Sequence, residues 1–287
     1  MIRNDIIRVS IIGAGTIATK VHIPCFLRNK YAKVDAIVDI DPKKAESVAR
    51  KFGIKRFFSS TDKLFNSIKV DAISICTPPD SHAEIAVEAL ERGINVLCEK
   101  PLADNVKNGL KIVEAAEGSD TVLMIGFQRR FYPIYLKVKS IAKEGKIGNI
   151  YLTEYFSLHQ SPLLAWSKSQ WYYQVGTGGS LLDIGPHVLD MLNWFLGRPY
   201  SVCAFGGIHS DSPVNEYCVV TVEYDYAVGV GIMSWLSSEK IEKLGIHGTG
   251  GTLYASPRFM LDVNPTDVSE LSLWRAATST LVNKVKE

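Results

Sequence analysis

The chain has 287 residues, of which 46% are hydrophobic and 22% charged, a balance typical of a soluble globular protein large enough for two domains. Its 32 basic and 30 acidic side chains leave a formal charge of +2, which argues against nucleic acid or an acidic membrane surface as a partner. No apolar run approaches the roughly 18 residues that span a bilayer, and no signal-peptide pattern opens the chain. The five cysteines are odd in number and form no C-x-x-C pair, which favours a reducing, cytoplasmic location over a disulfide framework or a zinc ribbon.

Short apolar runs alternate with helical patterns up to about residue 126 of the chain. The strand candidates are Arg8–Ile12, Val34–Val38, Ala72–Ile75, Asn95–Cys98 and Val122–Ile125. These runs are apolar along their length, as expected for strands covered on both faces. Repeated β-α-β units require a parallel sheet with right-handed crossovers, so residues 1–126 are predicted to form an α/β domain.

The helices between these strands have recognisable ends. One is predicted to begin after Asp41, with Pro42 in its first position, and to end at Gly53. Another is predicted to begin with a capping box between Ser81 and Glu84.

The pattern changes after residue 126. The sequence predicts a helix over Pro133–Glu144, a long strand over Asn149–Leu158, an aromatic loop at 166–173 and a helix behind a glycine run. From residue 200 onward, runs such as VVTVEYDYAVGVGIMSWL read as strands joined by short turns. Residues 127–287 are therefore predicted to form a second, α+β domain with a mainly antiparallel sheet.

The stretch VSIIGAGTIA places a glycine-rich turn directly after the first strand. Gly13 allows the tight turn, Gly15 lets the backbone approach a pyrophosphate, and Ala18 allows close packing of helix on strand. Thr16 and Ile17 open the helix whose positive end would face the phosphates. This context predicts a Rossmann dinucleotide site, with a methyltransferase or a cofactor-free α/β protein as the alternatives.

Asp39 ends the second strand, where a carboxylate can hold both ribose hydroxyls of a dinucleotide. The same carboxylate would repel a 2′-phosphate, and no basic residue follows directly, since Ile40, Asp41 and Pro42 come next. NAD is therefore favoured over NADP.

Two further segments follow strands and are expected at the cofactor side of the sheet. ICTPPDSH brings Thr77, Pro78 and His82 there, although for His82 a packing role is favoured over direct catalysis. VLCEKPLA brings Glu99 and Lys100, and a lysine beside a nicotinamide can stabilise negative charge on a substrate oxygen. Taken alone, that charged pair is more typical of a solvated surface.

The segment LLDIGPHVLDML carries a carboxylate, Asp183, and an imidazole, His187, four residues apart and so on one face of a helix. They could begin a metal site, but a third ligand is needed, and the other candidates are scattered: His159, His209 and His247. No metal is predicted. A structural pair and an acid–base apparatus remain as alternatives.

Several motifs occur together in a familiar order: GAGTIA, DAISICTPPDSH, EKP, GFQRRFYP, GKIGNIY, GTGGSLLDIGPHVLDMLNWFLGRP and IHGTGGTL. Over residues 6 to 255 the chain closely resembles the Gfo/Idh/MocA family of NAD(P)-dependent oxidoreductases, which act mostly on sugars, inositols and related polyols. The resemblance implies a catalytic set of Lys100, Asp183 and His187. It also implies a sugar or polyol substrate, a Lys–Pro peptide bond that is often cis, and a homodimer or homotetramer built through the second sheet.

The implied chemistry is hydride transfer between nicotinamide and a CH–OH carbon. In the oxidative direction His187 would take the hydroxyl proton, for which the ordinary histidine pKa of about 6.5 is suitable. Lys100 would hold the reacting oxygen, and Asp183 would contact a substrate hydroxyl. Asp190, seven residues past Asp183, is expected to be structural.

Substrate contacts are expected from two groups of side chains. Arg130 and Tyr132, beside Arg129, follow the last strand of the first domain. An aromatic loop precedes the glycine run and could cover the C–H face of a sugar ring, through Trp166, Trp171 and Tyr172. Packing beneath the sheet explains the aromatic loop nearly as well.

Two classes of function follow. The first is a dehydrogenase or reductase, and the second is a cofactor-binding sensor or structural protein that uses the same fold without catalysis. The joint presence of Lys100, Asp183 and His187 favours the enzyme. Compared with its relatives the chain is expected to be short after GTGGTL, with one amphipathic segment over Val268–Val285.

Overall fold

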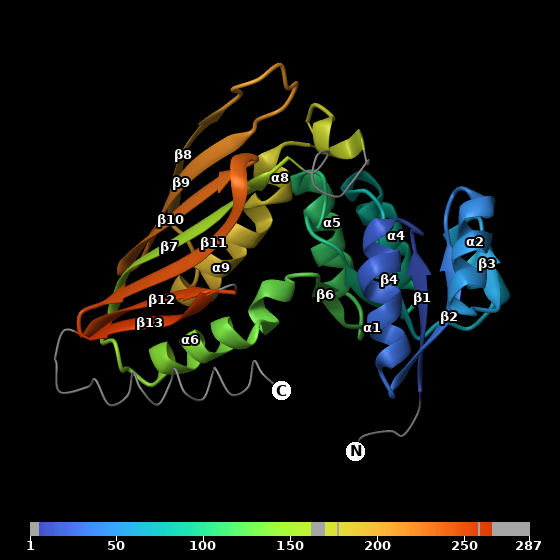
Figure 1. Ribbon diagram of the computed structural model, residues 1–287. Helices are drawn as coiled ribbons and strands as arrows, with labels where there is room; N and C mark the ends of the chain where they lie inside the picture. The colour runs from blue at the N-terminus through green and yellow to red at the C-terminus, as the bar shows by residue number, and fades with distance from the viewer. Residues whose placement is uncertain (1–5, 162–169, 177, 258, 266–287) are drawn as a thin grey trace. The chain divides into compact units, whose positions relative to one another are not determined.

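In a computed structural model the chain divides into two compact units, Met1–Gly126 and Phe127–Glu287 (Figure 1). The structure describes residues 6–161, 170–176, 178–257 and 259–265. Within these ranges, no helix combines the length and the apolar character that crossing a membrane requires.

The first unit is built on a six-stranded parallel sheet in the order β3-β2-β1-β4-β5-β6. Its strands are β1 (Ile7–Ile12), β2 (Ala32–Val38), β3 (Arg56–Phe58), β4 (Ala72–Ile75), β5 (Asn95–Cys98) and β6 (Leu123–Ile125). The five predicted strands are confirmed. The edge strand β3 was not predicted, because three largely exposed residues are too few to show a hydrophobic pattern. The strand order changes direction between β1 and β4, which is the topological switch point of the sheet. Ligands of such sheets bind at this point, outside the carboxyl ends of the strands.

Helices connect these strands. They are the π-helical turn η1 (Ala18–His22), α1 (Ile23–Arg28), α2 (Pro42–Phe52), α3 (Thr61–Ser67), the 3₁₀ turn η2 (Pro79–Ser81), α4 (His82–Glu91) and α5 (Val106–Glu117). The predicted ends of α2 are confirmed, because the Asp41 carboxylate accepts hydrogen bonds from the amides of Lys43 and Lys44 and Gly53 adopts φ 68°. The predicted capping box was wrong. Ser81 lies inside the turn η2, and its hydroxyl donates to Pro78 O and Thr77 Oγ1 instead.

The second unit contains a seven-stranded sheet in the order β13-β12-β11-β7-β10-β9-β8. Its strands are β7 (Ile150–Gln160), β8 (Ser201–Gly207), β9 (Tyr217–Tyr224), β10 (Ala227–Ser234), β11 (Leu236–Gly248), β12 (Gly251–Ser256) and β13 (Phe259–Pro265). All neighbours are antiparallel except β7 and β10. The predicted fold class is therefore confirmed. The strand β13 was not predicted, and Val268–Val285 lies outside the described residues.

One face of this sheet is covered by helices and holds the core. The helical segments are η3 (Gln128–Phe131), α6 (Pro133–Lys143), η4 (Gln170–Tyr173), α8 (Ser180–Asp183) and α9 (Gly185–Leu196). Alternate residues of β9 are buried and exposed, as expected when one face packs and the other does not. The buried set includes Tyr155 of β7, Val188 and Leu192 of α9, and Val220 of β9.

The segment with Asp183 and His187 was predicted as a single helix, and this was wrong. It is broken at Ile184 into α8 and α9. Pro186 has no amide proton and cannot continue the hydrogen-bond ladder, so the chain restarts with His187 and Val188 both donating to Ile184 O. Because Ile184 keeps a right-handed helical conformation, Asp183 and His187 remain about one turn apart.

Candidate active site

The glycine-rich turn of the first unit is closed so tightly that only glycine fits at its first position. Gly13 has φ 94°, and its amide donates to Val38 O at 2.7 Å. A Cβ atom there would lie 2.9 Å from both the carbonyl carbon and the oxygen of Cys76, a distance at which the backbone must move. The turn leads at once into a helix, since Thr19 N donates to Gly15 O. This backbone path fits a pyrophosphate placed at a helix N-terminus, with Thr16, Ile17 and Ala18 in the first turn.

Asp39 braces this turn from the end of β2. Its Oδ2 accepts the Ala14 amide at 2.8 Å, and its Oδ1 accepts the Asp41 amide at 3.0 Å. Lys44 Nζ lies 3.1 Å from Asp39 Oδ2. Sequence reasoning missed this cation, because it considered only the three residues directly after Asp39. The first turn of α2 brings Lys44 back toward the carboxylate, so Asp39 acts beside a positive charge that lessens repulsion of a 2′-phosphate.

The segment after β4 is held from behind by His82. The imidazole is fully buried, at 0% exposure, with Nδ1 3.0 Å from Pro101 O and Nε2 2.9 Å from Thr77 O. Direct contact of His82 with a cofactor, predicted from the sequence, is therefore wrong, because both ring nitrogens face backbone carbonyls. His82 instead ties the segment carrying Thr77 and Pro78 to the loop after Lys100.

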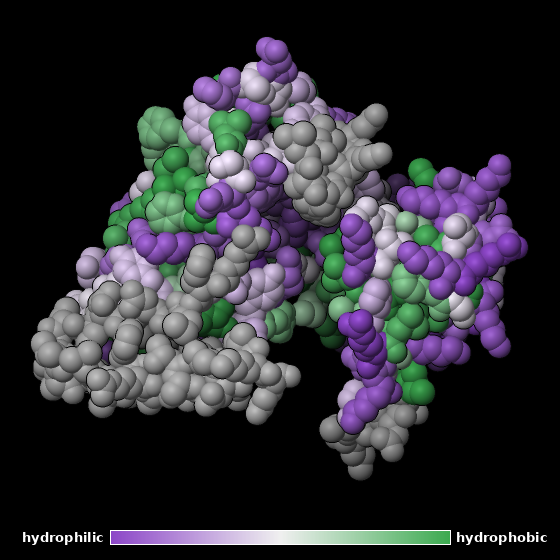
Figure 2. Space-filling view, viewed as in Figure 1, coloured by the Kyte–Doolittle hydropathy of each residue, from purple (hydrophilic) through white to green (hydrophobic). Residues whose placement is uncertain are grey.

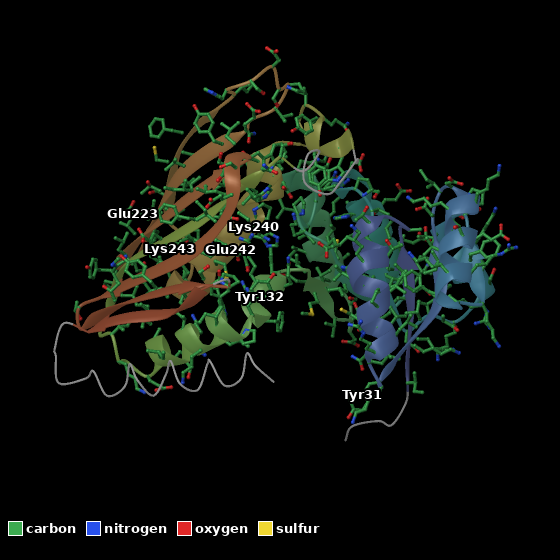
Figure 3. The ribbon with its side chains drawn as sticks, viewed as in Figure 1. Tyr31, Tyr132, Glu223, Lys240, Glu242 and Lys243 are labelled. Atoms are coloured by element: carbon green, nitrogen blue, oxygen red, sulfur yellow. The ribbon has the colours of Figure 1, made fainter. Side chains whose placement is uncertain are left out.

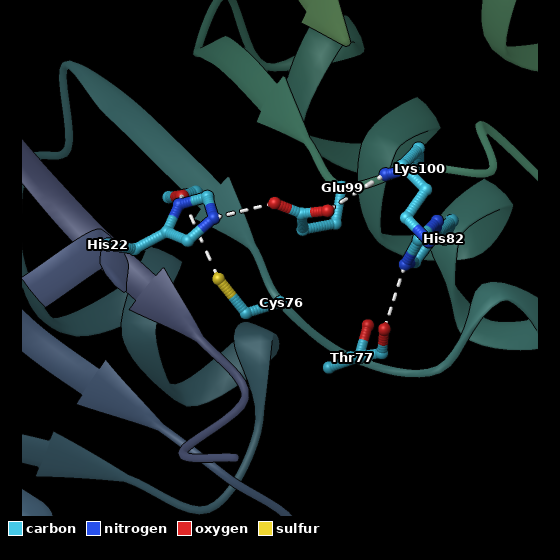
Figure 4. Close-up of polar contacts among 7 residues, drawn as sticks. His22, Cys76, Thr77, His82, Glu99 and Lys100 are labelled. Atoms are coloured by element: carbon cyan, nitrogen blue, oxygen red, sulfur yellow. Dashed lines mark hydrogen bonds and ion pairs between the residues drawn. The ribbon is translucent and has the colours of Figure 1, made fainter. Parts of the chain in front are cut away.

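Glu99 and Lys100 follow β5, and the Lys100–Pro101 peptide bond is cis. Glu99 is not a solvated surface residue. Its Oε1 lies 2.8 Å from His22 Nε2, and its Oε2 accepts the Lys100 amide at 3.2 Å (Figure 4). The other ring nitrogen of His22 lies 2.8 Å from Ser74 Oγ. Sequence reasoning missed His22. Its one signal was a histidine in the first helix, directly before Ile23 and Pro24.

In the second unit, a glycine run precedes the two helices that carry Asp183 and His187. Gly178 passes so close to the aromatic turn η4 that a Cβ atom would lie 2.3 Å from Tyr172 O. The Asn215 side-chain oxygen then accepts the Leu181 amide at 2.9 Å and anchors the start of α8. Asp183 and His187 are both buried.

Trp235, which lies between β10 and β11, contacts Asp183 and was not identified from the sequence. Its Nε1 donates to Asp183 Oδ2 at 3.2 Å. The indole is also buried, with the Tyr173 ring 5.5 Å and the Tyr172 ring 6.3 Å away between centroids. A rigid aromatic donor of this kind fixes the orientation of a carboxylate.

We expect Trp235→Phe to lower turnover by about 10-fold to 100-fold, because a lost hydrogen bond to a charged group costs about 1.5–3 kcal/mol. The phenyl ring keeps most of the packing against Tyr172 and Tyr173, so the protein should remain folded. Steady-state kinetics and thermal unfolding measure the two effects, and Trp194→Phe on α9 controls for the type of substitution. Unchanged kinetics in a folded Trp235→Phe protein would contradict the role of Trp235.

Arg130 and Asp190 form an ion pair within the second unit. Arg130 Nη2 lies 2.6 Å from Asp190 Oδ1, and Nε lies 3.0 and 3.1 Å from the two carboxylate oxygens. The pair ties η3 to α9, three residues beyond His187. The side chain of Arg130 remains 40% exposed, so its outer edge stays accessible.

Arg129 belongs to a separate buried cluster beneath the sheet. Its Nε lies 3.4 Å from Glu242 Oε1, an oxygen that also accepts hydrogen bonds from the hydroxyls of Tyr155 at 2.7 Å and Tyr135 at 3.1 Å. Glu242 of β11 is labelled in Figure 3, together with Tyr132. Tyr132, half-buried, stacks on Tyr135 with ring centroids 5.9 Å apart. Burial, followed by the charge of Glu242, raises the pKa of Tyr132, so its hydroxyl remains a proton donor at neutral pH.

The predicted aromatic wall is only partly described by the structure. Trp171 stacks on Tyr172 with ring centroids 4.0 Å apart, and Tyr172 belongs to the buried core. Trp171 is half-buried and keeps an accessible edge. Trp166 lies outside the described residues.

No group of three or more His, Cys, Asp or Glu side chains able to hold a metal ion occurs among the described residues.

Comparison with known proteins places the whole arrangement in one family. The family model described as "Oxidoreductase family, NAD-binding Rossmann fold" matches residues 7–127, and the GFO/IDH/MocA C-terminal domain matches residues 135–254. D-glucoside 3-dehydrogenase of Escherichia coli (strain K12) is 31% identical over 193 residues, which are 67% of this chain and 55% of that protein. Inositol 2-dehydrogenase of Rhizobium meliloti (strain 1021) is 29% identical over 261 residues, 87% of this chain and 75% of that protein.

Solved structures agree with this placement. The WlbA dehydrogenase from Bordetella pertussis, in complex with NADH and UDP-GlcNAcA, shares the fold with a TM-score of 0.85 at 21% identity, over 99% of this chain and 85% of that one. Levoglucosan dehydrogenase, in complex with NADH and levoglucosan, gives a TM-score of 0.81 at 25% identity, over 91% and 77% of the two chains. With both family domains matched in order, the chain belongs to the Gfo/Idh/MocA family of oxidoreductases and carries its NAD-binding Rossmann fold.

Proposed function

We propose that this protein is an NAD-dependent dehydrogenase that oxidises a secondary hydroxyl group of a sugar, a cyclitol or a related polyol. The observation that carries the proposal is the glycine turn at Gly13, closed onto Cys76 and braced by Asp39, with Lys100 on the same sheet edge two strands away. This combination supports a bound dinucleotide and a cation beside it. The dehydrogenases among its relatives support the substrate class.

The first unit supplies cofactor binding. Gly13, Gly15 and the first helical turn support the pyrophosphate, and Asp39 supports the ribose hydroxyls. When bound, the nicotinamide supplies the acceptor for hydride. Lys100 holds the reacting oxygen by a charge-assisted hydrogen bond and stabilises the negative charge that develops there.

The second unit supplies proton transfer and substrate orientation. His187 takes the proton of the reacting hydroxyl group, while Asp183, held by Trp235, accepts a hydrogen bond from a substrate hydroxyl. Arg130, Tyr132 and Trp171 are the candidates for further contacts with the sugar, because each keeps an accessible edge.

The test is a panel of sugars, sugar glycosides and cyclitols incubated with NAD or NADP and followed by the absorbance of the reduced nicotinamide. myo-Inositol and D-glucosides come first, and binding of each cofactor is measured in parallel. We expect oxidation of at least one compound and tighter binding of NAD than NADP. Tight NAD binding without turnover on the full panel would favour a non-catalytic sensor, and binding of neither cofactor would refute the proposal.

We also propose that the protein forms a homodimer or homotetramer through the uncovered face of its second sheet. Register places Phe205, Val219, Ile232 and Phe156 in one row across β8, β9, β10 and β7. Phe205 is 75% and Val219 is 37% exposed, and Figure 2 shows hydrophobic side chains gathered over the strands at the left of this unit. An apolar face of this kind is typical of an obligate contact.

Substitution of both Phe205 and Val219 by glutamate is expected to convert the oligomer to a monomer in sedimentation equilibrium. Tyr226→Glu is the matched control, because Tyr226 is 91% exposed in the turn between β9 and β10. A monomeric wild-type protein at micromolar concentration would contradict the proposal.

The cytoplasm is the proposed compartment, which the free thiols of all five cysteines support.

A further inference from the structure

A buried, charged pair lies directly behind Lys100, in a part of the first unit that the proposed chemistry does not use. His22 has a side-chain exposure of 8% and Glu99 of 17%, and their facing atoms are 2.8 Å apart. Burying two ions is costly unless each is paired and hydrogen-bonded. Such a pair, placed beside a candidate catalytic lysine, calls for an explanation beyond packing.

The pair joins three segments of the sheet's carboxyl edge. His22 belongs to the π-helical turn η1, which follows the glycine-rich turn, and π-helical turns of this kind occur frequently at functional sites. Ser74, on β4, contacts the opposite ring nitrogen. Glu99, after β5, donates its own amide to Ile75 O and accepts the Lys100 amide. His22 is thereby connected to the Lys100 backbone through Glu99 (Figure 4).

The surroundings of the pair favour the charged form of both members. Burial by itself lowers the pKa of His22, but hydrogen bonds and charges from Cys76 and Glu99 outweigh burial and raise it to about 10. Burial by itself raises the pKa of Glu99, but the hydrogen bond and charge of His22, together with the Lys100 charge, bring it below its ordinary value. The two directions are consistent with one imidazolium–carboxylate pair.

The consequence for Lys100 is electrostatic. An unneutralised carboxylate one residue away would attract the Lys100 ammonium and compete with any substrate oxygen for it. A positive charge on the far side of that carboxylate offsets the attraction. The backbone bond from Lys100 N to Glu99 Oε2 also fixes the start of the lysine side chain.

We propose that His22 and Glu99 are positioning residues for Lys100, in which His22 neutralises the Glu99 carboxylate so that the lysine ammonium is directed to the substrate oxygen. The catalytic part of this inference rests on the proposed function. The part concerning the charge balance at Lys100 does not, and it can be measured without a substrate.

The first experiment is competitive labelling of the full-length protein with a trace of acetic anhydride, read by peptide mass spectrometry. The rate at Lys100 is expressed relative to the exposed Lys107 of α5 in the same molecule. In His22→Gln, which keeps an amide donor but no charge, we expect Lys100 to react about tenfold more slowly, because an unneutralised carboxylate within a few ångström holds its proton. Adding Glu99→Gln to this variant should restore the wild-type rate.

A purely structural role for His22 would not be rescued in this way, because Glu99→Gln removes a partner without refilling the space. An unchanged rate in folded His22→Gln, or a slow rate that the second substitution does not restore, would overturn the inference. If His22→Gln does not fold, the labelling rate of Lys100 in Glu99→Gln is the test. Because His22 neutralises the Glu99 carboxylate in the wild type, its removal should leave the labelling rate of Lys100 nearly unchanged. A large increase in that rate would overturn the inference.

Kinetics provide the second readout. With the substrate found in the panel, His22→Gln should reduce kcat by about tenfold and leave NADH binding unchanged, since a misplaced charge acts on the transition state. The double variant should regain the kcat of Glu99→Gln. His209→Gln, at an exposed position of the second unit, is the control. Labelling effects without any turnover would support the charge balance and count against the proposed function alone.

Discussion

His187→Ala is expected to reduce turnover by about 100-fold or more, the usual contribution of a positioned general base. The imidazole is buried at the start of α9, where Pro186 restarts the helix and Ile184 O accepts the His187 amide. A buried imidazole on an anchored helical turn suits proton transfer at a fixed distance. NAD affinity should be unchanged, because the residues proposed to hold NAD all belong to the first unit.

The measurement is steady-state oxidation of the panel substrate, with NADH binding followed by fluorescence. His209→Ala is the matched control, because His209 is exposed and lies outside the proposed site. His187→Gln should be as slow as His187→Ala, since an amide donates hydrogen bonds but does not take a proton. Full activity in either variant would remove His187 from its proposed role.

Lys100→Met is expected to lower kcat by about 100-fold to 1000-fold, as found when a preorganised donor to a developing oxyanion is removed. Methionine retains most of the length and of the apolar stem of lysine. The hydrogen bond from the backbone amide of residue 100 to Glu99 Oε2 and the packing of the stem should therefore persist. Lys100→Arg retains the charge, but its planar guanidinium cannot place one donor on the same spot. We expect it to recover only part of the lost rate.

A substitution of Lys100, unlike one of His187, could also change the affinity for the cofactor. Lys100 is next to Glu99 in the cofactor-binding unit, so NADH fluorescence must be measured for each variant to separate binding from turnover. Lys107→Met on the same unit is the control for loss of one exposed cation. Equal kcat for Lys100→Met and wild type would refute the assignment of Lys100.

The sequence by itself determined the parts of this protein whose physics is local. Continuous apolar runs identified five strands of a sheet covered on both faces, and the cap at Asp41 and the end at Gly53 located α2. The glycine turn after β1 was readable because positive φ and close backbone approach require a particular residue at that position. The family resemblance rested on the same kind of short motif and added Lys100, Asp183 and His187 as candidate catalytic residues.

Tertiary structure decided the partners that lie far apart in the chain. His22 and Glu99 are separated by 77 positions, and Trp235 and Asp183 by 52. No periodicity or spacing encodes such pairs, because they form only when packing brings different elements to one place. The same reason explains His82, whose burial between two carbonyls makes it a structural tie. Lys44 is a local case, because one helical turn returns it to Asp39. The sequence states which chemical group each residue carries, whereas the fold determines which charged and hydrogen-bonding groups surround it.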